Sequence, residues 1–394
     1  MTTPRRTGIA HLPLHGGKAP AWLFQRMTRL AKAMCIALVE EKGPEDVLER
    51  LSHPYWFQAL GCVLGFDWHS SGVTTTVCGA LKEGLRDIQD SLGLYVAGGK
   101  GATSRKTPAE VRAVGERLGQ DLSGLVYASR MAAKVDTAAL QDGYQLYHHT
   151  FLFTSRGLWA VVQQGMNEET RYARRYHWLG SRVTDFVCEP HNAVCSEATG
   201  TVLNLVAQES AEARAAITHV DTQERPEQVV GELHRLQALD LPARHHLALE
   251  DIHPEHIVRA LLSSYERKPS NFEGLLALEG LGAKTVRALS LVAELVYGAP
   301  ASVRDPALYS FAHGGKDGHP YPVDRRTYDA TIAFMETALR RATMGDRDRV
   351  EALRRLYAMW ERDRDVDTPP RAGTMDIGTL APPGREANSG EGLK

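Results

Sequence analysis

The sequence has no surplus of either charge, few cysteines and no long apolar run. Its formal net charge is −2 over 394 residues, so any contact with a polyanion must come from a local basic patch. The five cysteines are scattered and odd in number, which favours a reducing compartment over a disulfide-bonded exterior. No apolar run approaches the length of a membrane span, and the first residues lack the apolar core of a signal peptide. We therefore expect a cytoplasmic protein without a membrane partner, of undetermined oligomeric state.

The length predicts more than one domain. A hydrophobic fraction of 43% with 24% charged residues is ordinary for a globular protein, but 394 residues exceed the size of one typical domain. We expect an α+β protein, in which residues 1–205 form a mixed α/β domain and 206–225 a junction. Residues 226–365 then form an all-helical domain. A tail at 366–394, rich in Pro, Gly and polar residues, is expected to be disordered.

Periodic apolar patterns place the elements of the first domain. They predict helices over 22–41 and 44–51, buried strand or loop over 56–74 leading into a helix, and a β-hairpin over 150–164. Residues 92–111 predict a strand, a Gly-rich loop and a helix that starts with a capping box at Thr107. The loop carries Lys100, Arg105 and Lys106, so a phosphate contact and a solvated surface loop are both open interpretations.

The stretch LLALEGLGAKTVRAL at 275–289 predicts two helices joined by a tight turn. Gly280 and Gly282 allow backbone conformations that other residues avoid, and Lys284 opens the second helix. The free N–H groups of such a turn and helix start suit an anion, and basic side chains stand beside them. The stretch resembles the helix-hairpin-helix motif of DNA-binding proteins. This resemblance implies DNA contacts, to double or single strands, at Gly280, Gly282, Thr285 and Arg287.

Other basic residues are candidates for the same partner. Arg174 and Arg175 alternate with aromatic residues in RYARRYHWLGSR, a composition that suits phosphates and unpaired bases. An exposed amphipathic helix is the alternative interpretation of this run. Lys316, Arg325 and Arg326 follow the hairpin stretch, and we also expect them to contact DNA.

A possible catalytic pair lies in the C-terminal part. Tyr-Pro-Val-Asp ends at Asp324, before a predicted helix. Over residues 226–364 the chain resembles the helix-hairpin-helix DNA glycosylase and AP-lyase superfamily, and Lys284 and Asp324 match its lysine and aspartate. The resemblance implies that Lys284 attacks the sugar carbon to form a Schiff base and that Asp324 stabilises developing charge, without a cofactor. We therefore expect a DNA-repair enzyme of this type. For each residue alone, a phosphate contact by Lys284 or a helix cap by Asp324 is the alternative.

The N-terminal half offers a second possible active site. Asp67 and His69 are polar residues in an apolar surrounding, where polar groups need partners or a purpose. His148, His149 and Asn167 are distantly similar to the phospholipase-D-type nuclease motif, although its Lys and Asp are missing. The function would then be a DNA nuclease that uses Mg or Mn or a histidine, with the hairpin as a DNA clamp. A buried strand bordered by core histidines is the structural alternative.

Two further interpretations complete the sequence reading. Cys188, His191 and Cys195 offer only three ligands on one loop, so we expect no zinc. The stretches GIAHLPLHGGKAPAWLF, GFDWHSSG and ARRYHWL are similar to an archaeal and bacterial family of unknown function that covers most of the chain. That similarity implies no mechanism, so a non-catalytic DNA-binding repair factor is also an open function.

Overall fold

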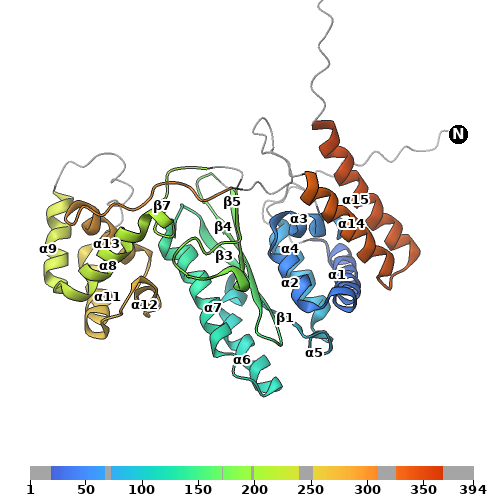
Figure 1. Ribbon diagram of the computed structural model, residues 1–394, viewed down its shortest axis with the longest axis horizontal. Coiled ribbons are helices and arrows are strands. Elements are labelled where there is room, and N and C mark those ends of the chain that lie inside the picture. The colour runs from blue at the N-terminus through green and yellow to red at the C-terminus, as the bar shows by residue number, and fades with distance from the viewer. Residues whose placement is uncertain are drawn as a thin grey trace, which may run out of the picture.

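A five-stranded antiparallel sheet lies at the centre of the molecule, in the strand order β1-β3-β4-β5-β6 (Figure 1). The computed structural model describes residues 19–66, 72–170, 172–196, 199–238, 252–308 and 325–366. The sheet strands are β1 (Leu94–Lys100), β3 (Gln145–Thr154), β4 (Trp159–Met166), β5 (Ala173–Leu179) and β6 (Ala193–Ser196). A separate pair joins β2 (Leu140–Gln141) to β7 (Leu203–Asn204).

Helices occupy most of the remaining described chain. Before the sheet these are α1 (Ala21–Lys42), α2 (Pro44–Ser52), α3 (Pro54–Val63), α4 (Gly72–Leu85) and α5 (Gln89–Leu92). The 3₁₀-helix η1 (Gly101–Lys106), α6 (Thr107–Leu118), α7 (Ser123–Lys134) and the π-helical turn η2 (Val135–Ala139) lie between β1 and β2. After the sheet follow α8 (Ala211–Gln223), α9 (Pro226–Gln237), α11 (Pro254–Arg267), α12 (Phe272–Leu276), α13 (Ala283–Leu295), α14 (Arg325–Arg341) and α15 (Asp346–Val366). The α+β fold class is confirmed.

The sheet is buried on both faces. Successive side chains of a strand point to opposite faces, so Phe151 and Phe153 join one core while Leu152 joins another. The first core continues through α6 and α7 into α8–α13. The second contains α1–α4 together with α14 and α15, on the other side of the sheet (Figure 1). Because of this double burial, strands such as ARRYHWL have no solvent-exposed face.

The helices from the two ends of the chain share the second core. Met335 of α14 and Leu356 of α15 are buried in one cluster with Met27, Leu48 and Phe57. The packing of α14 and α15 therefore differs from the expected division, which placed residues 325–365 with the helical domain that follows residue 225. Helices α12 and α13, on either side of the predicted hairpin turn, instead share the first core with the sheet.

Several local predictions are confirmed and two are wrong. Helices α1 and α2, the β1–η1–α6 succession and the β3–β4 hairpin lie where the sequence predicts them. The expected strand or loop near residue 56 is instead α3, whose ten residues are all buried, so no helical period is visible. The expected capping box is absent, because Glu110 accepts from Gly98 N at 2.7 Å and from Lys82 instead. ARRYHWL forms β5, which rules out the alternative interpretation of this run as an exposed amphipathic helix.

Across the described ranges, no helix combines the length and apolar character that crossing a membrane requires.

Candidate active site

A pocket of about 580 Å³ lies where the sheet, α7 and the turn between α12 and α13 meet. Ser129 of α7, His149 of β3 and Gln163 of β4 contribute its buried polar groups. Arg105 of η1, with Arg130 and Lys134 of α7, adds three basic side chains to its lining. Residues 276–279, at the end of α12 and the start of the hairpin turn, form part of its wall. The volume lies within the usual range of small-molecule sites.

The register of the β3–β4 hairpin brings His149 and Gln163 together. His149 on β3 lies directly opposite Gln163 on β4, and both face the first core. Nδ1 of His149 lies 2.8 Å from Oε1 of Gln163, while Nε2 of His149 lies 2.9 Å from Oγ of Ser129. These two contacts occupy both ring nitrogens of His149.

The surrounding hydrogen bonds fix the protonation of His149. The Gln163 amide nitrogen donates to Asp136 at 2.5 Å and to the carbonyl of Ala132 at 3.2 Å, so its oxygen faces the histidine. A carbonyl oxygen only accepts, so Nδ1 of His149 carries the hydrogen in this contact. In the neutral ring Nε2 then has a free lone pair, which accepts the hydroxyl hydrogen of Ser129. The arrangement places a proton acceptor beside the serine hydroxyl.

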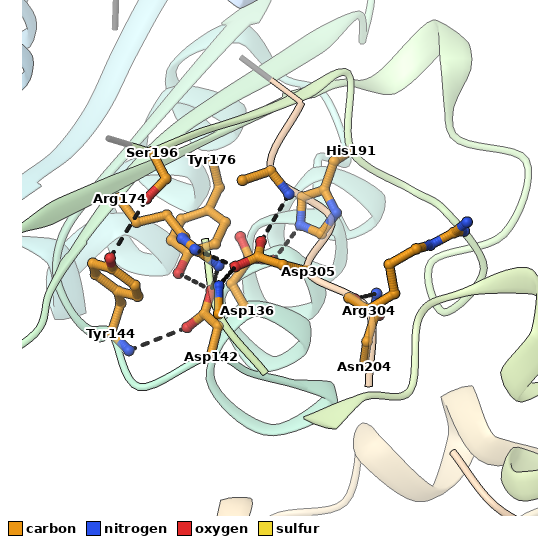
Figure 2. Close-up of polar contacts among 12 residues, drawn as sticks. Asp136, Asp142, Tyr144, Arg174, Tyr176, His191, Ser196, Asn204, Arg304 and Asp305 are labelled. Atoms are coloured by element: carbon orange, nitrogen blue, oxygen red, sulfur yellow. Dashed lines mark hydrogen bonds and ion pairs between the residues drawn. The ribbon is translucent and has the colours of Figure 1, made fainter. Parts of the chain in front are cut away.

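Asp136 is the buried hub of this network. Besides Gln163, it accepts a hydrogen bond from Trp178 Nε1 at 3.0 Å and lies 2.5 Å from Nε2 of His191. Figure 2 shows the His191 contact. The Asp136 side chain is completely buried, and its position in the π-helical turn η2 directs it towards the sheet. Three donors around one carboxylate compensate for its removal from water.

Burial keeps both adjacent histidines neutral near pH 7. It lowers the pKa of His149, and the hydrogen bond to Gln163 offsets only part of this effect. Burial lowers the pKa of His148 to about 3, with further contributions from His149 and Lys100. A neutral His149 can act as a general base. His148 also borders the pocket, but its Nε2 bonds Thr150 at 2.9 Å, and its side chain belongs to the opposite face of β3.

Lys134 connects the pocket to the turn between α12 and α13. Its Nζ donates to the carbonyl of Leu278 at 3.4 Å, and its half-buried position lowers its pKa. Gln141 makes a second connection, because its amide donates to the carbonyl of Ala283 at 3.0 Å while its oxygen accepts from Arg287 at 2.7 Å. These contacts hold the turn against α7 and β2.

The predicted DNA contacts of the hairpin differ in exposure. Gly280, Gly282 and Lys284 are exposed, and Gly280 has a φ of +89°, which favours glycine. Thr285 is buried, and Arg287 is only half exposed and bonds Gln141. The exposed ammonium of Lys284 is not in the desolvated setting that a Schiff-base lysine needs.

The two sheet arginines, predicted to contact DNA, are buried instead. Arg174 is 1% exposed and lies 2.9 Å from Asp142 and 2.7 Å from Asp305. Figure 2 shows its contacts with these two carboxylates. Arg175 is fully buried on the opposite face and bonds His177 and Gln58. Both guanidinium groups are enclosed by protein, so neither reaches DNA in this structure.

The other candidates lie away from the pocket or outside the described residues. Asn167 accepts from the backbone N–H groups of Glu169 and Thr170, and so stabilises the turn after β4. Asp67, His69, Lys316 and Asp324 lie outside the described residues, as do the side chains of Arg325 and Arg326 at the start of α14. Within the described part of the chain, no group of three or more His, Cys, Asp or Glu side chains could hold a metal ion.

Ser129, Gln163 and Asp136 were not predicted from the sequence as site residues. A signal for Gln163 was present, because the short turn at 155–158 places residues 149 and 163 opposite each other in the hairpin. Ser129 and Asp136 come from a preceding helix and turn, and their approach to β3 depends on packing that no local pattern encodes.

The fold and pocket define an α+β protein with a basic, histidine-containing pocket between a sheet and a helical hairpin. The chain belongs to the DUF763 family, described as a protein of unknown function, whose family model matches residues 8–323. That match covers the sheet, the pocket and the hairpin, and it confirms the expected family membership over most of the chain. No curated protein and no solved structure matches the chain.

Proposed function

We propose that this protein is a DNA-processing hydrolase that cleaves a phosphodiester bond in the pocket around His149. The observation that carries the proposal is that one pocket is lined by the Ser129–His149 pair, by three basic side chains and by the hairpin loop. Base, anion-binding groups and a candidate DNA clamp therefore meet at one place.

The chemistry of the lining favours a phosphate substrate. Phosphodiester cleavage needs a group that removes a proton from the nucleophile and positive charge that stabilises the phosphoryl oxygens. His149 supplies the first, and Arg105, Arg130 and Lys134 supply the second. The whole chain has a formal net charge of −2 and so does not attract anions in general. The three basic side chains would attract an anion only at the pocket.

The hairpin supports DNA as the source of the phosphate. Its exposed glycines and the start of α13 offer backbone N–H groups, and Lys284 is exposed beside them. DNA held there would continue towards the pocket wall at 276–279. The glycosylase and AP-lyase activity stays a prediction, as does a DNA-binding role without catalysis. We rank the lyase second because Lys284 is exposed.

Cleavage of end-labelled DNA tests the proposal. Single-stranded and duplex DNA are incubated with the full chain in EDTA, then with Mg²⁺ or Mn²⁺, and cleavage is compared with that by His149→Asn. We expect the variant to lose about 10²- to 10⁴-fold in rate, the usual contribution of a general base. Arg112→Ala, exposed and outside the pocket lining, is the matched control, which should keep the cleavage rate.

Borohydride trapping on abasic DNA, together with a DNA-binding measurement, separates the alternatives. A borohydride-trapped adduct on abasic DNA that is lost in Lys284→Ala would favour the lyase and overturn the hydrolase proposal. DNA binding without cleavage under any of these conditions would favour the non-catalytic factor.

A further inference from the structure

We propose that Ser129 is the nucleophile of the pocket and forms a covalent phosphoserine intermediate with a phosphodiester substrate. The inference rests on the proposed function for its choice of phosphate as the group attacked. The serine was not a candidate from the sequence, and the observations that single it out are the partner of its hydroxyl, the protonation of that partner and the charge of its surroundings.

The hydrogen bond of Ser129 is unusual for a serine inside a helix. Serine and threonine hydroxyls in helices commonly bond the carbonyl one turn earlier, and Thr137, Thr218 and Ser264 do so here at 2.8–2.9 Å. Ser129, in the middle of α7, instead places Oγ 2.9 Å from Nε2 of His149. The hydroxyl is therefore paired with a base rather than with its own helix.

The chain of contacts behind His149 has the order that nucleophilic hydrolysis requires. Ser129 contacts His149, His149 contacts Gln163, and Gln163 contacts Asp136. A base next to a hydroxyl, itself oriented by a third group, is the general arrangement of an activated nucleophile. Gln163 takes the position beside the histidine that a carboxylate more commonly occupies. The Asp136 carboxylate holds the Gln163 amide, and the amide in turn orients His149. Gln163 and Asp136 are thus positioning residues.

The position of Ser129 suits attack on an anion. Ser129 is 2% exposed and lines the pocket. Arg130 follows it in the chain, and Lys134 lies on the same helix; both line the same pocket. Their positive charge would offset the repulsion between the oxygen nucleophile and the phosphoryl oxygens.

The reaction balances with water as the only co-substrate. In the first step the Ser129 Oγ–P bond forms and the bond from phosphorus to one bridging oxygen breaks. The hydroxyl proton passes to Nε2 of His149 and then to the leaving oxygen. In the second step water attacks phosphorus, the Oγ–P bond breaks, and His149 carries the proton from water to Ser129. No electrons are exchanged.

Labelling with a fluorophosphonate tests this inference without DNA. The probe reacts with activated serine hydroxyls, since Oγ displaces fluoride from phosphorus. The full chain, Ser129→Ala and Ser123→Ala are treated, and the modified residue is located by peptide mass spectrometry. Ser123 lies exposed at the start of the same helix and serves as the matched control. Thermal melts of all three establish that each is folded.

We expect a label on Ser129 in the wild type and in Ser123→Ala, and at least a 100-fold slower reaction in Ser129→Ala. Folded wild-type protein with no label on Ser129 would overturn the inference. DNA cleavage that survives in Ser129→Ala would also overturn it, while the proposed function would stand with water as the direct nucleophile. Labelled Ser129 without any DNA cleavage would support the nucleophile and contradict DNA as the substrate.

Discussion

The side-chain nitrogen of Gln163 lies 2.5 Å from a carboxylate oxygen of Asp136, and this contact determines which nitrogen of His149 carries a proton. Because the amide nitrogen is engaged, the amide oxygen must face His149. The free lone pair of the ring is then on the nitrogen that contacts Ser129. A carboxylate that lies outside the pocket lining thus sets the chemistry of a group within it.

Removal of the Asp136 carboxylate should destabilise the fold strongly. Asp136→Ala leaves the donors of Gln163, Trp178 and His191 buried without their acceptor. At about 1–3 kcal/mol for each unsatisfied donor, we expect a loss of at least about 3 kcal/mol in the free energy of unfolding. Urea denaturation measures the change, with the exposed Asp87→Ala as control, expected within about 0.5 kcal/mol. A loss below about 1 kcal/mol for Asp136→Ala would contradict the hub role.

Arg174 should matter for stability and not for DNA binding. Arg174→Met leaves the carboxylates of Asp142 and Asp305 buried without their cation, and breaking a buried pair costs about 3–5 kcal/mol. The exposed Arg112→Met should change stability by no more than about 0.5 kcal/mol. Denaturation gives the stability, and fluorescence anisotropy with labelled DNA gives the affinity of the folded fraction. A stable variant with weakened DNA binding would restore Arg174 as a DNA contact.

The sequence was informative where local patterns decide the structure. The glycine-rich stretch that ends β1, and the turn at 155–157 between two apolar runs, identified these segments because turn residues and short apolar runs are local properties. Helix α3 was predicted as strand or loop, and strand β5 was not predicted, for one reason. Every residue of Pro54–Val63 and of Ala173–Leu179 is buried, so neither segment has the alternation between a buried and an exposed face that reveals a period.

The pocket was only half visible in the sequence. The neighbouring histidines 148 and 149 attracted attention together, but a strand sends them to opposite faces, and only His149 contacts Ser129 in the pocket. The same alternation separates Arg174 from Arg175. Ser129 and Asp136 reach His149 and Gln163 across 20 and 27 residues of chain, through packing of α7 and η2 that no motif records.

Stability should fall as the solution is acidified below neutral pH. Burial lowers the pKa values of His148, His149 and His177 in the folded state, so the unfolded chain binds more protons below pH about 6.5. The free energy of unfolding should therefore decrease by up to about 1.4 kcal/mol per pH unit for each histidine. Burial raises the pKa of Asp221 to about 6, which has the opposite effect at lower pH.

Urea denaturation between pH 7.5 and 6 measures this dependence in the window where the histidines dominate. His148→Gln should show a smaller slope than the wild type, because one proton-linked group is gone. Stability that is constant, or that rises on acidification, would contradict the neutral burial of these histidines.

DNA binding should depend on salt through the pocket cations. If Arg105 and Arg130 each neutralise one phosphate, replacing either by Ala should reduce the slope of log K against log salt by about 0.7 for single strands, or about 0.9 for duplex DNA. Arg112→Ala, exposed and outside the pocket lining, should leave the slope unchanged. Anisotropy titrations at several salt concentrations measure the slopes. Equal slopes for all variants would place the DNA elsewhere.

The most direct measurement is a crystal structure of the full chain with a short oligonucleotide that carries a cleavage-resistant phosphorothioate. If the pocket is the active site, one phosphorus atom should lie within about 3.5 Å of Ser129 Oγ, the distance at which reacting atoms are poised. Its oxygens should contact Arg130 or Lys134, and the strand should pass the hairpin turn. A strand bound at Lys284, with its nearest phosphate far from Ser129, would contradict the central claim and return the chemistry to the hairpin.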